Sequence, residues 1–286
     1  MAFKMFCFGL GYSAQALAQL LMAKGWSVAG TARRPERLAE LEAQGITATD
    51  FDALASLQGV SHILLSIPPG PDGDPVLLRH SALLAKAAPA LRWIGYLSTT
   101  GVYGDHGGAW VDETTPTKPG SERTRRRAAA EQAWLAFGTA QGIKTQVFRL
   151  AGIYGPGRSV LDDIRAGTAQ RIIRPGQMFS RIHVADIARI LQAAMTGSSK
   201  AEIFNVCDDE PAASADVVAF GCHLLGLAPP PEIPFEDAGM SSMALSFWAD
   251  NKRVRNDRIQ AELGVTLTYP TYREGLTALT MPSAGL

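Results

Sequence analysis

A glycine-rich turn near the start of the chain constrains its fold more than any other feature. Residues 8–14 have the sequence FGLGYSA, which fits the pattern G-x-G-x-x-G/A. An apolar run at 4–8 precedes the turn and a helical pattern at 13–24 follows it, which is the context that the pattern requires. We therefore predict a strand, a tight turn and a helix in direct succession.

The turn has the composition of a site for the pyrophosphate of a dinucleotide. Gly9 permits the tight turn, Gly11 lets a phosphate approach the backbone, and Ala14 lets the helix pack closely on the strand. The N-terminus of the helix offers unpaired N–H groups and a partial positive charge to the phosphates. The alternative is an ordinary connection between a strand and a helix. In the glycine turn, at the start of its helix and in the second predicted strand, the residues expected to contact the dinucleotide are Gly9, Gly11, Tyr12, Ser13, Ala14 and Thr31.

The first half of the chain alternates short apolar runs with helical patterns. The apolar runs occupy 4–8, 26–32, 46–51, 62–67, 93–98 and 145–150, and the helical patterns 13–24, 35–44, 75–88 and 121–141. Several runs are continuously apolar, as parallel strands covered on both faces are. The pattern predicts an α/β fold, a doubly wound parallel sheet of the Rossmann type with right-handed crossovers.

Prolines and glycines interrupt this pattern after Gly152. Helices are predicted at 184–195, 214–225 and 256–263, and a strand at 203–207. We expect a dinucleotide-binding domain over 1–155, to which 180–207 return. Residues 156–179 and 208–286 then form a small C-terminal α+β lobe that binds the substrate.

The end of the second predicted strand indicates which dinucleotide binds. A site for NAD usually has Asp or Glu there to accept hydrogen bonds from the ribose 2′-OH. This chain has Arg33 and Arg34 instead, with no carboxylate before Glu36. A guanidinium can pair with a 2′-phosphate that a carboxylate would repel. The two arginines therefore favour NADP, with NAD as the alternative, unless they are simply the solvated start of the next helix.

Charge and composition exclude several kinds of partner. The chain has 27 basic and 27 acidic residues, so no overall field attracts nucleic acid or an anionic membrane. No stretch approaches the roughly 18 uninterrupted apolar residues of a membrane helix. Cys7, Cys207 and Cys222 are far apart, which argues against disulfides and against zinc or another metal, and favours small buried residues. We expect a cytoplasmic protein whose partner is a small molecule.

Further segments occur in an order typical of one superfamily. Asp50 and Phe51 follow the third strand, and LSTTGVYG (97–104), RLAGIYGPG (149–157), IHVADIA (182–188) and FNV (204–206) come later. With the glycine turn, they make nearly the whole chain resemble the extended branch of the short-chain dehydrogenase/reductase superfamily, the nucleotide-sugar epimerases and dehydratases. The resemblance implies an NAD(P)-binding oxidoreductase or epimerase acting on a nucleotide-sugar or a similar carbonyl or hydroxyl compound. It also implies that a homodimer would form through helices near 121–141.

The resemblance assigns roles to individual residues. Asp50, followed by Phe51, would hold the adenine amino group, and the stretch of Ser66, Ile67 and Pro68 would pass under the cofactor. Two arginines that would meet a substrate diphosphate are Arg158 and Arg181.

The chain departs from the superfamily at its catalytic residues. Thr99 stands where a Ser or Thr orients the substrate, but the expected Tyr-x-x-x-Lys motif is missing. Alignment puts Arg123 at the tyrosine position and Arg127 at the lysine position, and no tyrosine occurs between residues 103 and 154. Arginine stays protonated up to about pH 12, so it is a poor group for moving protons. The chain therefore resembles the atypical subgroup that keeps the cofactor fold without the usual catalytic set.

Candidates for the remaining chemistry are Thr99, Tyr103, Arg123 and Arg127. Tyr103 is either a substitute acid or a structural residue of its turn. Arg123 and Arg127 share a helix face, on which they either meet an anionic group or remain solvated. His106, on a neighbouring loop, is a further candidate for proton transfer. Two functions stay open: an NADP-dependent oxidoreductase or epimerase with a displaced acid–base residue, and an NADP-binding sensor or interaction protein with little or no turnover.

Overall fold

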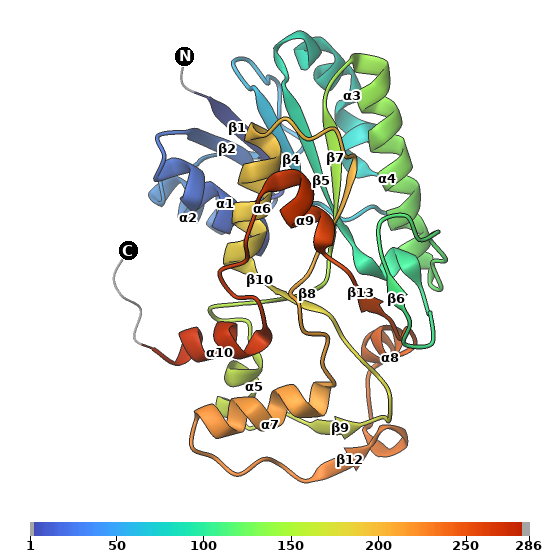
Figure 1. The fold of residues 1–286 in the computed structure, drawn as a ribbon. Coiled ribbons are helices and arrows are strands. Elements are labelled where there is room, and N and C mark those ends of the chain that lie inside the picture. The colour runs from blue at the N-terminus through green and yellow to red at the C-terminus, as the bar shows by residue number, and fades with distance from the viewer. Residues whose placement is uncertain (1–2, 282–286) are drawn as a thin grey trace.

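Seven parallel strands form one sheet with helices on both of its faces (Figure 1). The computed structural model describes residues 3–281, so residues 1, 2 and 282–286 of the predicted domains lie outside the described residues. The strands in their order across the sheet are β3 (Thr47–Asp50), β2 (Ser27–Ala32), β1 (Lys4–Phe8), β4 (His62–Leu65), β5 (Trp93–Thr99), β7 (Thr145–Leu150) and β11 (Ile203–Val206). Because the order reverses beside β1, this is the doubly wound Rossmann fold that the sequence predicts.

Both faces of the sheet are buried, which explains the continuous apolar runs. In β1, Met5 and Cys7 pack into the core on one face, whereas Phe6 and Phe8 pack into the core on the other. The helices on the first face are α1 (Tyr12–Met22), α2 (Pro35–Ala43), α6 (Val184–Thr196) and α9 (Asp257–Leu263), and those on the second are α3 (Pro75–Ala87) and α4 (Glu122–Gln141). No helix between residues 3 and 281 is long and apolar enough to cross a membrane.

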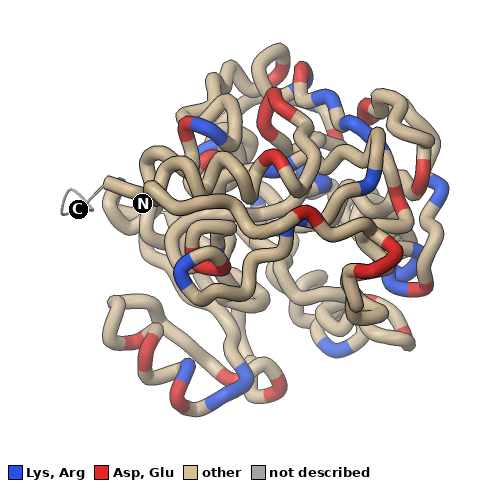
Figure 2. The backbone as a smooth tube through the Cα atoms, turned by 90° about the horizontal axis from the view of Figure 1, so that it is seen from below, with Lys and Arg blue, Asp and Glu red and all other residues tan. Residues whose placement is uncertain are grey.

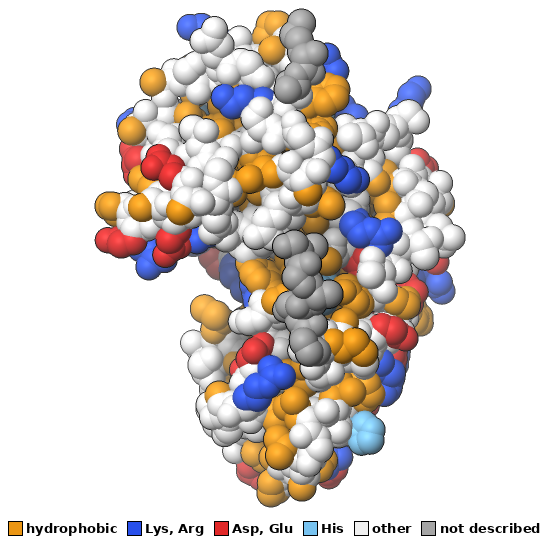
Figure 3. All heavy atoms as spheres, turned by 90° about the vertical axis from the view of Figure 1, so that its left-hand side faces the viewer, with side chains coloured by type: hydrophobic (Ala, Val, Ile, Leu, Met, Phe, Trp, Pro, Cys, Tyr) orange, Lys and Arg blue, Asp and Glu red, His pale blue; other side chains and the backbone are white. Residues whose placement is uncertain are grey.

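A smaller part of the molecule lies below the sheet in Figure 1. Its elements are α5 (Val160–Arg165), β9 (Arg171–Ile173), α7 (Ser214–Leu224), β12 (Glu232–Pro234), α8 (Ser242–Trp248) and α10 (Tyr272–Thr280). The short parallel pair of β8 (Gly152–Tyr154) and β10 (Arg181–His183) connects this part to the sheet. Figure 3 shows a notch that narrows the outline of the molecule between its two parts.

One segment of the predicted lobe returns to the sheet. β13 (Arg253–Val254) pairs with β6 (Trp110–Val111), and α9 packs against α6 with Ile259 in the core. Because α10 lies in the smaller part again, the chain crosses between the two parts twice more than the predicted boundaries imply. The remaining elements are the short 3-10 helices η1 (Ala88–Ala90), η2 (Thr100–Tyr103) and η3 (Phe235–Asp237).

A buried line of polar contacts joins α4 to three strands of the sheet. Glu131 of α4 forms an ion pair with Arg149 of β7 at 2.7 Å, and the two side chains are 1% and 4% exposed. Ser98 of β5 donates a hydrogen bond to the same carboxylate. The Arg149 guanidinium lies 4.8 Å from the centroid of the Tyr103 ring, and the Tyr103 hydroxyl donates to Asn205 Oδ1 of β11 at 2.8 Å.

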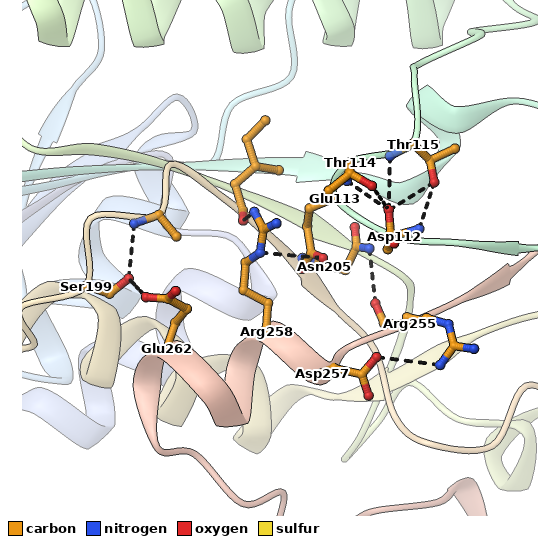
Figure 4. A network of polar contacts seen from close by, with 12 residues as sticks. Asp112, Glu113, Thr114, Thr115, Ser199, Asn205, Arg255, Asp257, Arg258 and Glu262 are labelled. Atoms are coloured by element: carbon orange, nitrogen blue, oxygen red, sulfur yellow. Dashed lines mark hydrogen bonds and ion pairs between the residues drawn. The ribbon is translucent and has the colours of Figure 1, made fainter.

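The line continues beyond the sheet, where Figure 4 shows it in close-up. The Asn205 side chain donates to the Arg255 carbonyl (3.0 Å), and its backbone N–H donates to the buried carboxylate of Glu113 (2.8 Å). Glu113 in turn lies 3.7 Å from the guanidinium of Arg258 on α9. The neighbouring Asp112 accepts hydrogen bonds from the turn that follows it. Both carboxylates are therefore structural.

Removing one partner of the buried ion pair should destabilise the fold. Arg149→Met leaves the Glu131 carboxylate buried without a cation, and we expect a loss of about 3–5 kcal/mol in the free energy of unfolding, measured with urea. Adding Glu131→Gln removes the stranded charge and should recover part of this loss. The exposed Arg125 of α4, paired with Glu122, supplies the control, since Arg125→Met should cost less than about 1 kcal/mol. Equal stability of the single and double variants would contradict this account.

Candidate functional site

The glycine turn lies where β1, β2 and β4 end side by side. Gly9 has a φ of +85°, and a Cβ added to it would lie 2.8 Å from Ile67 Cγ1. Its N–H donates to the Thr31 hydroxyl (3.0 Å), and its carbonyl accepts from the Ser66 hydroxyl (2.7 Å). The structure thus brings together four residues predicted for the cofactor site. Glycine is required at position 9 by the protein itself.

The protein's own structure does not require a glycine at position 11. Its φ is −79°, which any residue adopts, and a Cβ added to it would meet no protein atom within 4 Å. Behind it, Ser13 and Ala14 are buried against the strand, so α1 presents its first N–H groups next to Gly11. This open side is where a pyrophosphate would approach the helix N-terminus, so the residues present fit a dinucleotide.

Tyr12, predicted as a cofactor residue, connects the turn to another loop. Its hydroxyl donates to the Pro156 carbonyl (3.0 Å), and the Arg158 guanidinium lies 5.6 Å from the centroid of its ring. Its side chain therefore fixes the loop after β8 against the start of α1. The same contact places the Arg158 guanidinium beside the start of α1.

Three arginines gather beside the end of β2. The side chains of Arg33 and Arg34 are exposed, and residues 3–281 contain no ion-pair partner for either. Arg37, which the sequence interpretation missed, donates to the Leu10 carbonyl in the glycine turn (3.5 Å) and pairs with Glu40 (2.6 Å). Its position in the first turn of α2, three residues after Arg34, was the available signal.

Asp50 and Phe51 end β3 at the same edge of the sheet. Asp50 Oδ1 accepts hydrogen bonds from the N–H groups of Asp52 (2.8 Å) and Ala53 (3.2 Å), so the carboxylate caps its own turn. Phe51 is buried, and its carbonyl lies 2.9 Å from His80 Nε2. The predicted cofactor residues therefore all lie along the carboxyl ends of β1 to β4, while Pro68 is exposed just beyond β4.

A cleft made of two adjoining cavities, each of about 370 Å³, runs from the glycine turn toward the smaller part of the molecule. The first cavity is lined by Gly11, Ser66 and Arg158, and the second by Arg181, Asp250 and Lys252. The residues that line both cavities are Thr99, Arg123, Thr124, Leu150, Ala151, Gly152 and Phe247.

Three of the four predicted catalytic residues line this cleft. Thr99 ends β5, and its hydroxyl accepts from the Gly101 N–H (3.1 Å). The Arg123 guanidinium lies 4.4 Å from the centroid of the Phe247 ring, a contact that leaves the edge of its N–H groups for a ligand. Arg127 donates to the Leu97 carbonyl (2.8 Å), which holds it against the end of β5.

Tyr103, the fourth predicted catalytic residue, does not reach the cleft. Its side chain is fully buried, its hydroxyl donates to Asn205, and burial raises its pKa. A structural role therefore replaces the catalytic interpretation of Tyr103. His106 is tied to the same turn, with Nε2 3.1 Å from the Tyr103 carbonyl, and does not line either cavity.

Cationic side chains dominate the charged residues of the cleft. Those that line one or both cavities are Arg123, Arg127, Arg158, Arg181 and Lys252, against the single carboxylate of Asp250. Arg181 already donates to the carbonyls of Phe179 (2.8 Å) and Ala212 (3.1 Å). Elsewhere the basic and acidic positions are interspersed along the chain (Figure 2). The cleft therefore favours an anionic ligand, which the overall neutral composition does not reveal.

Known proteins share this architecture. A family model described as the NAD dependent epimerase/dehydratase family matches residues 80–207. A solved structure of a functionally unknown conserved protein from Silicibacter pomeroyi is 48% identical, with a TM-score of 0.91 and coverage of 97% of this chain and 98% of that chain. The UDP-glucuronic acid 4-epimerase from Bacillus cereus, solved with UDP-glucuronic acid and NAD, is 17% identical, with a TM-score of 0.74 and coverage of 96% and 97%.

A named reductase is also similar over most of its length. The 3-diazoavenalumate denitrifying reductase of a Streptomyces species is 27% identical over 297 residues, which cover 91% of this chain and 94% of the relative. Together with the Rossmann sheet, the glycine turn and the adjoining cleft, these similarities define a class. Residues 80–207 match the NAD dependent epimerase/dehydratase family, and the chain as a whole has the fold of the solved epimerase, in agreement with the resemblance of its sequence motifs.

The two glycines of the turn should respond differently to substitution. Gly9→Ala forces a side chain into the left-handed region and against Ile67, so we expect a loss of about 1–3 kcal/mol in the free energy of unfolding. A Cβ at position 11 would meet no atom of residues 3–281 within 4 Å, so Gly11→Val should change stability by less than about 1 kcal/mol, yet it should abolish dinucleotide binding by closing the approach to the helix N-terminus. Urea unfolding and NADPH fluorescence measure the two effects. Unchanged NADPH affinity in Gly11→Val would contradict the assignment of the phosphate site.

Proposed function

We propose that the protein is an NADP-dependent oxidoreductase that acts on a small anionic molecule carrying a carbonyl or hydroxyl group. The observation that carries the choice of cofactor is the pair of exposed guanidiniums, Arg33 and Arg34, at the end of β2. A ribose 2′-phosphate beside them would gain charge-assisted hydrogen bonds. The two arginines stand at the start of α2, where cations oppose the helix dipole, so an anionic partner explains their placement.

Residues at the carboxyl ends of β1 to β3 would hold the dinucleotide both at its pyrophosphate and at its adenine. Gly9 and Gly11 would receive the pyrophosphate, and Asp50 would accept from the adenine amino group. The Bacillus cereus neighbour holds NAD, but at 17% identity that protein shares the fold and does not decide the cofactor of this one. NADP therefore rests on the side chains of this chain.

Residues that line the cleft would orient the substrate. When bound, a nicotinamide dinucleotide supplies or accepts a hydride. The Thr99 hydroxyl would position the substrate oxygen at the end of β5, and Arg123, stacked on Phe247, would pair with a carboxylate or phosphate. The Streptomyces relative is named a reductase, which supports hydride transfer as the class of reaction. A nucleotide-sugar is one anionic substrate that the cleft would accept.

Replacing both arginines should change the preference between dinucleotides. The double variant Arg33→Ala, Arg34→Ala loses two charge-assisted hydrogen bonds, so we expect NADPH affinity to fall about 10–100-fold while NADH affinity stays the same. Titration of the fluorescence of each reduced dinucleotide measures both constants. Arg125→Ala, on the exposed face of α4, is the control and should change neither. A double variant that binds NADPH as tightly as the unaltered protein would exclude the proposed 2′-phosphate site.

Turnover of bound NADPH separates the two functions left open by the sequence. We would screen small carboxylates, phosphates and nucleotide-sugars that carry a carbonyl group, following the absorbance of NADPH. Consumption with an anionic carbonyl compound, and its loss in Arg123→Ala, supports the oxidoreductase. Tight NADPH binding without consumption across all three classes would overturn it in favour of a sensor or interaction protein.

A further inference from the structure

Carbonyl reduction needs a proton as well as a hydride, and the predicted catalytic residues do not provide one. Arg123 and Arg127 keep their protons at working pH, and the Thr99 hydroxyl does not ionise. Tyr12 lines the first cavity, but its hydroxyl is bound to the Pro156 carbonyl. A proton donor must therefore come from another group that lines the cleft.

Lys252 lines the second cavity and is set there by a rigid backbone. The Asn251 N–H donates to Asp105 Oδ1 (2.8 Å), and the Arg253 N–H donates to the Ala109 carbonyl (2.9 Å). These bonds fix the residue on either side of Lys252 to the loop that follows η2. The Lys252 side chain is 10% exposed, so its ammonium lies in the cavity wall rather than in bulk water.

The ammonium of Lys252 has a carboxylate beside it. Its Nζ lies 3.3 Å from Asp250 Oδ2, and Asp250 lines the same cavity. Asp250 is itself held by its backbone, because its carbonyl accepts from the Gln177 side chain (2.9 Å). The Lys252 ammonium and its counterion, the Asp250 carboxylate, therefore already lie together in the cavity wall against which a substrate would bind.

Comparison with Lys144 shows that a structural role does not explain this placement. Lys144 is also partly buried, but its Nζ donates to the carbonyls of Ala194 and Gly197 (2.9 Å each) and so caps the end of α6. Within residues 3–281, Lys252 Nζ has no backbone carbonyl partner and contacts Asp250 alone. Its remaining N–H groups are thus available to a substrate oxygen.

We propose that Lys252 is the general acid of this site, donating its proton to the substrate oxygen with Asp250 as its partner. The inference rests on the proposed oxidoreductase function. In this reaction the carbonyl carbon would receive a hydride, and with it both electrons, from the reduced dinucleotide of the proposed function. As the carbonyl π bond opens, the Nζ–H bond of Lys252 breaks and an O–H bond forms, leaving a neutral amine and an alcohol. Solvent then returns a proton to the amine next to Asp250.

The surroundings of Lys252 shift the pKa of its ammonium below the ordinary value of a lysine. Burial lowers the pKa of its ammonium, while the carboxylates of Asp250 and Asp105 act in the opposite direction. An amine with a lowered pKa suits general acid catalysis better than an exposed lysine.

The first test measures the ammonium itself, in the full chain without dinucleotide or substrate. Acetic anhydride labels neutral amines, so labelling over a series of pH values, read by mass spectrometry, gives the pKa of each lysine. We expect Lys252 to lose its proton at a lower pH than the exposed Lys200, because burial disfavours the ammonium of Lys252. In Asp250→Asn its pKa should fall further, because the counterion is lost. A Lys252 that titrates with Lys200, or is insensitive to Asp250→Asn, overturns the proposal.

The second test uses a carbonyl compound that the NADPH screen finds to be reduced. Lys252→Arg keeps the positive charge but does not release a proton, so we expect kcat to fall about 100-fold or more while NADPH affinity is unchanged. Lys200→Arg is the matched control and should retain full turnover. Retained turnover in Lys252→Arg overturns the proposal. Failure of the unaltered protein to bind NADPH would instead refute the proposed function, whereas the labelling result stands without any dinucleotide.

Discussion

The buried ion pair between Glu131 and Arg149 is the contact on which the arrangement of the cleft depends. It ties the middle of α4 to β7, while Ser98 ties the same carboxylate to β5. A buried charge without its partner is costly, so α4 cannot slide or tilt without a large loss of stability. Because the N-terminal turns of this helix carry Arg123 and Arg127, the ion pair sets how the two guanidiniums stand over the ends of β5 and β7.

The same polar line also fixes the opposite wall of the cleft. From Arg149 it passes through the ring of Tyr103 to Asn205, and Asn205 holds the carbonyl of Arg255. Arg255 follows β13 directly, and Lys252 precedes it directly. The helix that carries the arginines and the segment that carries the lysine are therefore positioned by one continuous line of polar contacts, made of an ion pair, a cation–π contact and hydrogen bonds. Such satisfied networks hold a unique geometry, which a site for proton and hydride transfer needs.

The sequence predicted the expected cofactor residues at the glycine turn better than it predicted the cleft expected to bind the substrate, for a physical reason. The strands and helices up to residue 150 carry their own signals, namely continuous apolar runs, a glycine turn and capping residues. The cleft beyond Thr99 is formed by α4 and by α8 with the segment that follows it. These parts come together in space although they lie more than a hundred residues apart in the sequence. Phe247 and Lys252 sit in a short helix and a turn with no periodic pattern. The sequence left Tyr103 open as an acid or as a structural residue, because its turn carries no signal of burial, and the structure shows its side chain fully buried.

The alignment of Arg123 with the superfamily's tyrosine position and the proposed role of Lys252 as an acid are physically linked. A tyrosine acid works when neighbouring cations lower its pKa, so a guanidinium in its place brings charge without a transferable proton. The Arg123 guanidinium lines the same cavity as Lys252, whose ammonium pKa is lowered by burial, so the cavity offers a permanent cation and a transferable proton side by side. In the proposed reaction the arginine would bind the anionic group of the substrate, and the lysine would donate the proton to its oxygen.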